Sequence, residues 1–466
     1  MSTPNPSLRP GLVNHPSTPA TRGALLAMLA KDAEEHHCFT NELGFHNHLP
    51  HHLVAAFDMG ATHTLLKAIW DDETPTLKPI DRHGGEITAG NWAERLGEHR
   101  AYGSYYDFFK VQLAQKGASR VLAEYVLAPE ANAGKKKMFG RFLAGAVHPL
   151  LQVGFGLEFG QDNMVAAGLA MAALTAPDQP NYFLDATTGL PERLVKPVEG
   201  TTLLQLLQEV YDSDTLTPIM PYKPDALLST RFKDLAADPA RGEAIKAIYS
   251  KWALHSDSED ELNLKINECL LQATLLVTST GKAGRPARLD FFLMHALTSA
   301  LCLPPILRAI PSVEGRNIVL QGYARACAMY VILRGRPRVD GALIMSYPED
   351  PAPVGWGATG PGPSLGGGVI ANPWLPAIHS ALHHRDAHVI KVVRTLYYAA
   401  GRMPELDARL GAAGVVGGER LDGSVWVRAA GLVSKRLGWV AFGEKEREWD
   451  RSAHGWEAAW EGVDEE

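Results

Sequence analysis

Apolar residues recur at intervals of three and four along much of this chain, and this spacing constrains its fold more than any other feature. An α-helix brings such positions onto one face, whereas a half-buried strand needs strict alternation. Alternation is rare, and β-branched stretches such as Val339–Met345 are short. The spacing therefore predicts an all-α, mostly helical protein with long loops and few or no short strands. The pattern is clearest in Leu203–Tyr211, Leu262–Leu276, Phe291–Leu303, Ile318–Leu333 and Val389–Ala399.

The length of 466 residues suits one large helical body or two closely fused halves. We predict a single helical catalytic domain over residues 23–450. Residues 1–22 are rich in Pro, Ser and Asn without the apolar run of a secretory signal, so they are expected to form a flexible tail. Residues 451–466 are expected to form a C-terminal tail. The segment Pro348–Gly368 is rich in Pro and Gly, which predicts a long loop, either a functional lid or a disordered insertion.

Composition and charge exclude several classes of protein. The formal net charge is -7 and the longest basic run is Lys135–Lys137, so a nucleic-acid backbone has no complementary surface. The apolar stretches Phe142–Leu157 and Met164–Pro177 fall short of the roughly 18 residues of a membrane span, so we interpret them as buried helices. The four cysteines show no CxxC spacing, which predicts core thiols in a reducing, cytoplasmic setting.

The common cofactor and nucleophile motifs are missing. A dinucleotide fold needs GxGxxG between a strand and a helix, and the nearest glycines, Gly154 with Gly156 and Gly360 with Gly362, lack both the strand and the third glycine. We interpret them as packing or loop glycines. Phosphate-binding loops and GxSxG elbows are also absent. Any chemistry must therefore come from side chains or a metal.

Three of the 18 histidines lie in contexts where an imidazole would be buried or would enter a helix. His48 precedes Pro50 in GFHNHLPHHLVAAFDMGA, at the start of a helix expected to end near Gly60. His148 lies in the charge-free FLAGAVHPLLQVGFGLEFG, and His295 lies in DFFLMHALTSALCLP. Taken singly, each is better explained by a structural role, a helix cap for His48 and a hydrogen-bonded core residue for the others.

His388 and Lys391 are three residues apart in RDAHVIKVVRTLYYAAG and so share one helix face. A neutral imidazole and an ammonium gain nothing from each other. If both point inward, something anionic or metallic should lie between them. The alternative is that Lys391 extends along the helix surface to water.

Together these segments resemble the questin oxidase-like family of fungal secondary metabolism. The resemblance covers most of residues 40–430 and rests on an ordered set of four motifs. These are NHLPHHLVAAFDMGA, HPLLQVGFGLEF, HALTSALCLP and DAHVIKVVRTL. It implies an oxygenase that opens the central ring of a polyketide anthraquinone or its hydroquinone, either by a Baeyer-Villiger reaction or as a non-haem iron dioxygenase.

The resemblance also implies an iron site of four histidines and a lysine carboxylated on its side-chain nitrogen. The matching positions are His48, His148, His295, His388 and Lys391. His51 or His52 could replace His48, and His46 and His384 are weaker rivals.

The chemistry of these ligands narrows the choice of metal. Imidazole suits several metals, the lack of thiolates argues against a structural zinc site, and oxygen chemistry favours Fe(II) with O2 as co-substrate. Burial favours the uncharged form of a lysine, which can react with carbon dioxide to give a carbamate ligand. Uncarboxylated, Lys391 could instead be the catalytic base that ionises a phenol. Candidate stacking surfaces for a polycyclic aromatic substrate, with core packing as the alternative, are Tyr102, Tyr105, Tyr106, Phe108, Phe109, Trp356 and Trp374.

Two other functions are compatible with the sequence. One is a Baeyer-Villiger oxidase that uses NADPH, with a separate pathway reductase supplying the hydroquinone. The missing dinucleotide motif speaks against direct NADPH binding. The other is a non-catalytic carrier of a hydrophobic metabolite.

Overall fold

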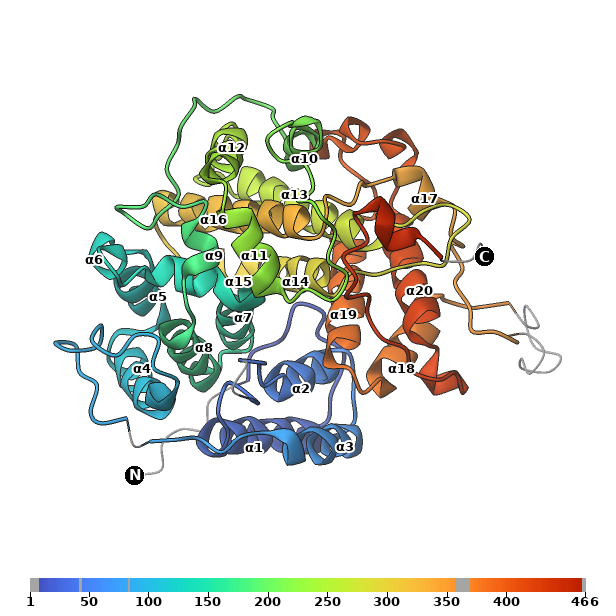
Figure 1. Ribbon diagram of the computed structural model, residues 1–466. Coiled ribbons are helices and arrows are strands. Elements are labelled where there is room, and N and C mark those ends of the chain that lie inside the picture. Colours follow the sequence, from blue (N-terminus) through green and yellow to red (C-terminus); the bar gives the residue numbers. More distant parts are fainter. Residues whose placement is uncertain (1–7, 42–43, 83, 357–368, 463–466) are drawn as a thin grey trace. The chain divides into compact units, whose positions relative to one another are not determined.

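The computed structural model describes residues 8–41, 44–82, 84–356 and 369–462. Within those ranges the regular structure is helical, and pairing between extended segments is limited to isolated bridges (Figure 1). The all-α prediction is confirmed. The helices are α1 (Pro19–Glu35), α2 (Leu49–Asp58), α3 (His63–Glu73), α4 (Tyr102–Lys116), α5 (Ala118–Leu122), α6 (Pro129–Asn132), α7 (Met138–Phe159), α8 (Asp162–Leu174), α9 (Asp178–Asn181), α10 (Leu203–Asp212), α11 (Leu228–Ala236), α12 (Pro239–Ser250), α13 (Glu259–Thr278), α14 (Phe291–Ala300), α15 (Leu303–Ala309), α16 (Val313–Leu333), α17 (Gly341–Met345), α18 (Trp374–His383), α19 (Ala387–Arg402) and α20 (Val425–Leu437).

The helical spacing located α10, α13, α16 and α19 correctly, but two expectations differ from the structure. The segment Phe291–Leu303 is broken, because α14 ends at Ala300 and α15 starts at Leu303. The β-branched stretch Val339–Met345 contains the short helix α17, and only Asp340 makes a bridge, to Val416. Asp340 accepts hydrogen bonds from the N–H groups of Ala342 and Leu343, so it caps this helix and favours it over a strand.

The chain forms two compact units. The first unit contains residues 1–198, 238–266 and 299–326, and the second contains residues 199–237, 267–298 and 327–466. The boundaries fall within α13, α14 and α16, so each of these helices contributes residues to both units.

Helix α7 is the central element of the first unit and packs against α8, α15 and α2. Glycines allow these close approaches: a Cβ on Gly154 would lie 2.3 Å from Cys302, and a Cβ on Gly168 would lie 2.7 Å from Val153. The interpretation of Gly154 as a packing glycine is confirmed. By length and composition α7 could cross a membrane, but 89% of its most apolar window is buried inside the protein, as in the core helix of any globular domain.

Residues 145–147 interrupt α7 with a left-handed turn. Gly145, Ala146 and Val147 have φ of 58°, 52° and 58°. This region costs a residue with a side chain about 1–2 kcal/mol, and a β-branched residue rarely occupies it. The right-handed helix resumes at His148, so Pro149 lies in a first turn, where its missing N–H is tolerated.

In the second unit, α18, α19 and α20 pack against one another (Figure 1). The C-terminal segment, expected to be a tail from residue 451, carries the buried side chains of His454, Trp456 and Trp460. The indole N–H of Trp460 donates a hydrogen bond to the backbone carbonyl of His454, so an internal hydrogen bond holds the conformation of this segment.

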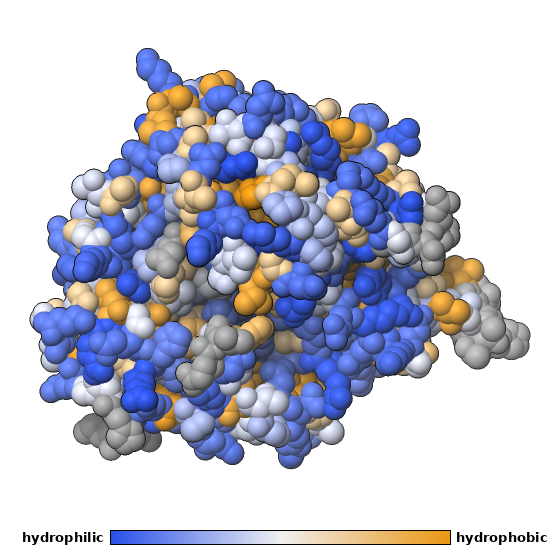
Figure 2. All heavy atoms as spheres, in the orientation of Figure 1, coloured by the Kyte–Doolittle hydropathy of each residue, from blue (hydrophilic) through white to orange (hydrophobic). Residues whose placement is uncertain are grey.

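The N-terminal segment also differs from a flexible tail over its described part. Backbone N–H groups of Val13 and Asn14 donate to the carboxylate of Asp58, and α1 begins at Pro19. Of the predicted long loop, residues 357–368 lie outside the described residues. The face seen in Figure 2 is mostly hydrophilic with scattered apolar residues, as composition predicts for a globular surface.

The left-handed turn predicts opposite effects for two small substitutions. Ala146→Gly should raise the free energy of unfolding by about 0.5–1 kcal/mol, because glycine adopts this conformation without steric cost. Gly145→Ala should lower it by about 1–2 kcal/mol, since its Cβ would also lie 3.2 Å from His46 Nε2. Urea unfolding of both variants measures the difference, and equal effects of the same sign would contradict the strained turn.

Candidate functional site

In the first unit, the ring of His148 is oriented by its own helix. His148 is 3% exposed, and its Nδ1 donates to the carbonyl of Gly145 at 2.6 Å. In a regular α-helix that carbonyl would accept from the N–H of residue 149, but Pro149 has none. The left-handed turn and the proline together therefore make the Gly145 carbonyl an acceptor for the imidazole.

His48 lies next to His148. Their ring centroids are 4.9 Å apart, and one ring nitrogen of each lies within 4.8 Å of the other. His48 is the N-cap residue of α2, with Pro50 in the first turn, as the sequence predicted. A helix start thus carries His48 to the side of His148.

The rivals of His48 have other surroundings. The ring of His51 stacks on Phe155 at 5.2 Å. His52 directs Nδ1 to the carboxylate of Glu73 on α3. His46 stacks face to face on His148, with centroids 3.7 Å apart and planes 5° apart. Sequence reasoning rated His46 as a weak rival, and its spacing along the chain gave no signal for this stacking.

In the second unit, Asp386 holds His388. Its Oδ1 accepts from the backbone N–H of His388 at 2.8 Å and from the ring Nδ1 at 2.6 Å. The first bond makes Asp386 the N-cap of α19, and the second fixes the imidazole. Sequence reasoning missed Asp386, although an aspartate just before a helical pattern is a recognisable capping signal.

His295 lies beside His388, with ring centroids 5.1 Å apart. Nδ1 of His295 donates to the carbonyl of Phe291 at 2.8 Å, one turn earlier on α14. The Phe291 ring contacts both imidazoles edge-on, at 5.0 and 5.2 Å, and the guanidinium of Arg451 lies 3.7 Å from its centroid.

A buried ion pair anchors the start of α14. Arg334 Nε donates to Asp290 Oδ2 at 2.7 Å, and both side chains are fully buried. Asp290 Oδ1 accepts from the N–H groups of Phe292 and Leu293, which caps the helix. Removing one partner of such a pair typically costs about 3–5 kcal/mol, so the position of His295 is firmly fixed.

Lys391 follows His388 by one helical turn and is only 1% exposed. This excludes the alternative in which its side chain extends along a helix surface to water. His384, the other rival in this unit, is a structural residue: its Nε2 donates to the carbonyl of Leu437, and its Nδ1 accepts from the N–H of Asp386.

The pKa values of His388 and of its partner Asp386 are both lowered. Burial lowers the pKa of His388, the charges of Lys391 and Arg451 add to this, and Asp386 opposes it. Burial would raise the pKa of Asp386, but the charge and hydrogen bonds of His388, with the charge of Lys391, hold it well below its usual value. The pair is thus a neutral imidazole beside an ionised carboxylate.

His148, His295 and His388 share one arrangement. Each donates from Nδ1 to an oxygen that can only accept, a backbone carbonyl or a carboxylate. The neutral ring therefore carries its proton on Nδ1 and its lone pair on Nε2. Histidines that bind metals show this pattern, because the Nδ1 bond fixes the ring and raises the basicity of Nε2.

The candidate stacking surfaces on α4 are core residues instead. Their side chains are at most 5% exposed, and Tyr105 donates to the carbonyl of Trp92. Trp356, by contrast, is 38% exposed, and Trp374 packs against Tyr397. All four cysteines are buried, as predicted.

Comparison with known proteins identifies the family. A family model described as questin oxidase-like matches residues 45–396. The chain belongs to the questin oxidase-like family.

Related members of this family are named for oxidation reactions. A Baeyer-Villiger monooxygenase of Cryptosporiopsis sp. is 28% identical over 385 residues, covering 79% of each chain. A Baeyer-Villiger oxidase of Pestalotiopsis fici is 26% identical, covering 79% of this chain and 78% of the relative. A questin oxidase of Aspergillus fumigatus is 29% identical, covering 61% of this chain and 65% of the relative.

The resemblance drawn from the four motifs is therefore confirmed, and this family member is an oxidoreductase of the oxygenase class. The carrier hypothesis receives no support, since these relatives are named as oxidases or monooxygenases.

The depressed pKa of His388 predicts how stability depends on pH. Between the usual value of 6.5 and its lower folded value, the unfolded chain binds the proton more readily, so the free energy of unfolding falls as the pH falls below about 6.5. Urea unfolding of chelator-treated protein from pH 7.5 to 5 measures this slope. His388→Gln should flatten it, whereas replacing the exposed His63 by Gln should leave it unchanged. An unchanged slope in His388→Gln would contradict the prediction.

Proposed function

We propose that this chain is a non-haem iron-dependent dioxygenase that cleaves the central ring of a polyketide anthraquinone or its hydroquinone. One Fe(II) ion is bound by His48, His148, His295, His388 and a carboxylated Lys391, with O2 as co-substrate. The reaction belongs to secondary-metabolite biosynthesis in the cytoplasm.

The observation that carries this proposal is the shared orientation of three buried imidazoles. A histidine that only fills a core needs partners for its nitrogens but has no reason to present the same one each time. Here His148, His295 and His388 all commit Nδ1 to an acceptor within four residues of the chain. Because Nδ1 of each ring is engaged in a hydrogen bond, Nε2 is the proposed ligand atom at all three positions.

The donor set fits iron. It offers imidazole nitrogens and one lysine but no cysteine, which disfavours a structural zinc site. Bound Fe(II) would supply the activation of dioxygen. The protein's own part is to hold the imidazoles at fixed orientations and, through Phe291, to cover His295 and His388 with an apolar ring.

Lys391 completes the proposed ligand set. An ammonium held at 1% exposure beside His388 would be costly, and carboxylation replaces it with an anionic oxygen ligand. In the uncarboxylated state, its neutral amine would instead accept the proton of a substrate phenol.

The substrate class rests on the family. Relatives carry the names questin oxidase and Baeyer-Villiger oxidase, and the sequence resemblance implies an anthraquinone-type ring. The proposed partner is therefore a small polycyclic aromatic molecule.

Substituting ligands from either unit tests whether they serve one ion. His148→Ala and His388→Ala should each lower iron affinity by more than about 100-fold. Losing only a hydrogen-bond partner of a metal ligand already lowers metal affinity by about 10–100-fold, and these variants lose the ligand itself. Iron per chain after anaerobic reconstitution is the measurement. His63→Ala, at an exposed position, is the control and should keep full iron. If each ligand variant lost only half of the bound iron, two separate sites would replace the single site proposed.

Lys391 has a test of its own. Lys391→Ala should lower both iron content and turnover, and added short carboxylates should restore part of the iron binding by replacing the carbamate oxygen. Loss of turnover with normal iron content would assign Lys391 as the base instead. Unchanged iron and unchanged turnover would remove it from the site.

A second candidate function is a Baeyer-Villiger oxidase that depends on NADPH through a separate reductase, which the names of several relatives favour. Reconstitution with Fe(II), followed by labelled oxygen and a reduced anthraquinone, separates the two by mass. Two labelled atoms in the product support the dioxygenase, and one supports the Baeyer-Villiger reaction.

A further inference from the structure

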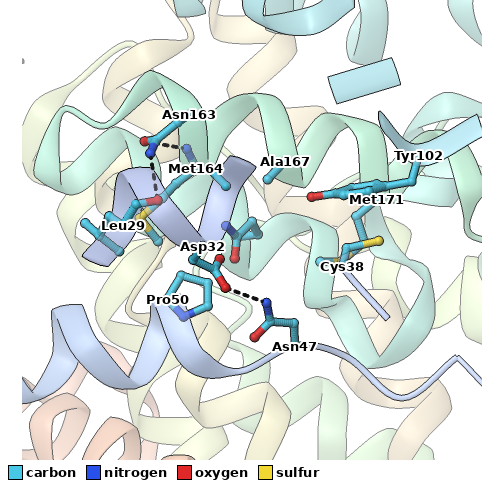
Figure 3. A pocket seen from close by; sticks show the side chains of 12 residues that line it. Leu29, Asp32, Cys38, Asn47, Pro50, Tyr102, Asn163, Met164, Ala167 and Met171 are labelled. Atoms are coloured by element: carbon cyan, nitrogen blue, oxygen red, sulfur yellow. Dashed lines mark hydrogen bonds between the residues drawn. The ribbon is translucent and has the colours of Figure 1, made fainter. Parts of the chain in front are cut away.

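A small cavity lies in the first unit among α1, α4, α7, α8 and the segment before α2 (Figure 3). Its volume of about 20 Å³ is enough to hold one water molecule. Both polar and apolar side chains line it. The polar ones are Asp32, Asn47, Tyr102, Gln152 and Asn163.

Gln152 presents an unsatisfied acceptor to this cavity. Its side chain is 3% exposed, and its Oε1 accepts no hydrogen bond from any residue that the structure describes. A buried amide oxygen without a partner is costly and rare in native proteins. Gln152 is also one helical turn after His148 on α7, so the cavity adjoins that part of the helix.

Asp32 supplies a second acceptor to the cavity. Its Oδ1 accepts from His36 Nδ1 at 3.0 Å and from Asn47 Nδ2 at 2.9 Å, the latter drawn in Figure 3. A carboxylate can accept further bonds, and Asp32 lines the cavity.

Tyr102 supplies a donor, because its hydroxyl points into the cavity (Figure 3). Burial raises the pKa of this phenol well above its usual value, so it keeps its proton. The cavity thus offers two acceptors and one donor, the complement of a water molecule that donates twice and accepts once.

We infer that this cavity is a binding site for one ordered water molecule, held by Gln152, Asp32 and Tyr102. The water links α7, which carries His148, to the Asp32–Asn47 pair that precedes His48. Asn47 Oδ1 in turn accepts from the N–H of Leu49 at the start of α2. The inference concerns the protein alone and does not rest on the proposed iron site.

A double-mutant cycle tests the shared water. Gln152→Met keeps similar volume without an acceptor, and Tyr102→Phe removes the donor. Among the described residues neither side chain hydrogen-bonds the other, so a water shared between them would couple the two substitutions. Each variant should raise the unfolding equilibrium constant several-fold, and the double variant should fall short of the product by about threefold or more.

The matched control combines Gln152→Met with Tyr105→Phe. Tyr105 lies on α4, as Tyr102 does, but its hydroxyl donates to the carbonyl of Trp92. That pair should be additive within about twofold. If Gln152→Met does not fold, Gln152→Leu also removes the acceptor and should show the same coupling with Tyr102→Phe. Additive effects in the test pair would overturn the inference.

A high-resolution crystal structure supplies the direct measurement. We expect one water within hydrogen-bonding distance of Gln152 Oε1, Asp32 and Tyr102, lost in Gln152→Met. An empty cavity, in maps that show other buried waters, would overturn the inference. So would an anomalous peak after rubidium soaking, which would identify a cation site.

Discussion

The hydrogen bond from His148 Nδ1 to the carbonyl of Gly145 is the interaction on which the first group of histidines depends. The left-handed turn at residues 145–147 and the missing N–H of Pro149 both contribute to it. Two residues with side chains occupy a conformation costing about 1–2 kcal/mol each. Strain of this kind persists where the surrounding structure enforces it, commonly at functional sites. The stacking of His46 on His148 and the nearness of His48 both follow from this ring position.

The second unit orients its histidines by two different local devices. His388 uses the side chain of its own helix cap, Asp386, and His295 uses the carbonyl of Phe291 on the preceding turn. The buried Arg334–Asp290 pair then fixes the start of the helix that carries His295. Three imidazoles therefore present Nε2 by three routes, which is the physical basis of the proposed metal site.

The polar cavity in the first unit also bears on how the elements that carry proposed ligands are positioned. Gln152 and Asp32 would each leave acceptor capacity unused in a dry interior, so a bound water explains why polar groups are retained there. The water would fix the register between α7 and the start of α2. Both elements carry proposed ligands, yet the water site can be tested without any metal.

The sequence by itself determined the all-α fold, several of the longer helices, the position of His48 before Pro50 and the family, because these depend on local spacing and short motifs. It also placed His388 and Lys391 on one helix face. Tertiary structure alone separated His48 from His51 and His52, which stand within four residues but meet His148, Phe155 and Glu73 respectively. It also revealed the left-handed turn, which an Ala-Val sequence argues against. Such features depend on contacts between segments distant in sequence, and a local pattern carries no information about them.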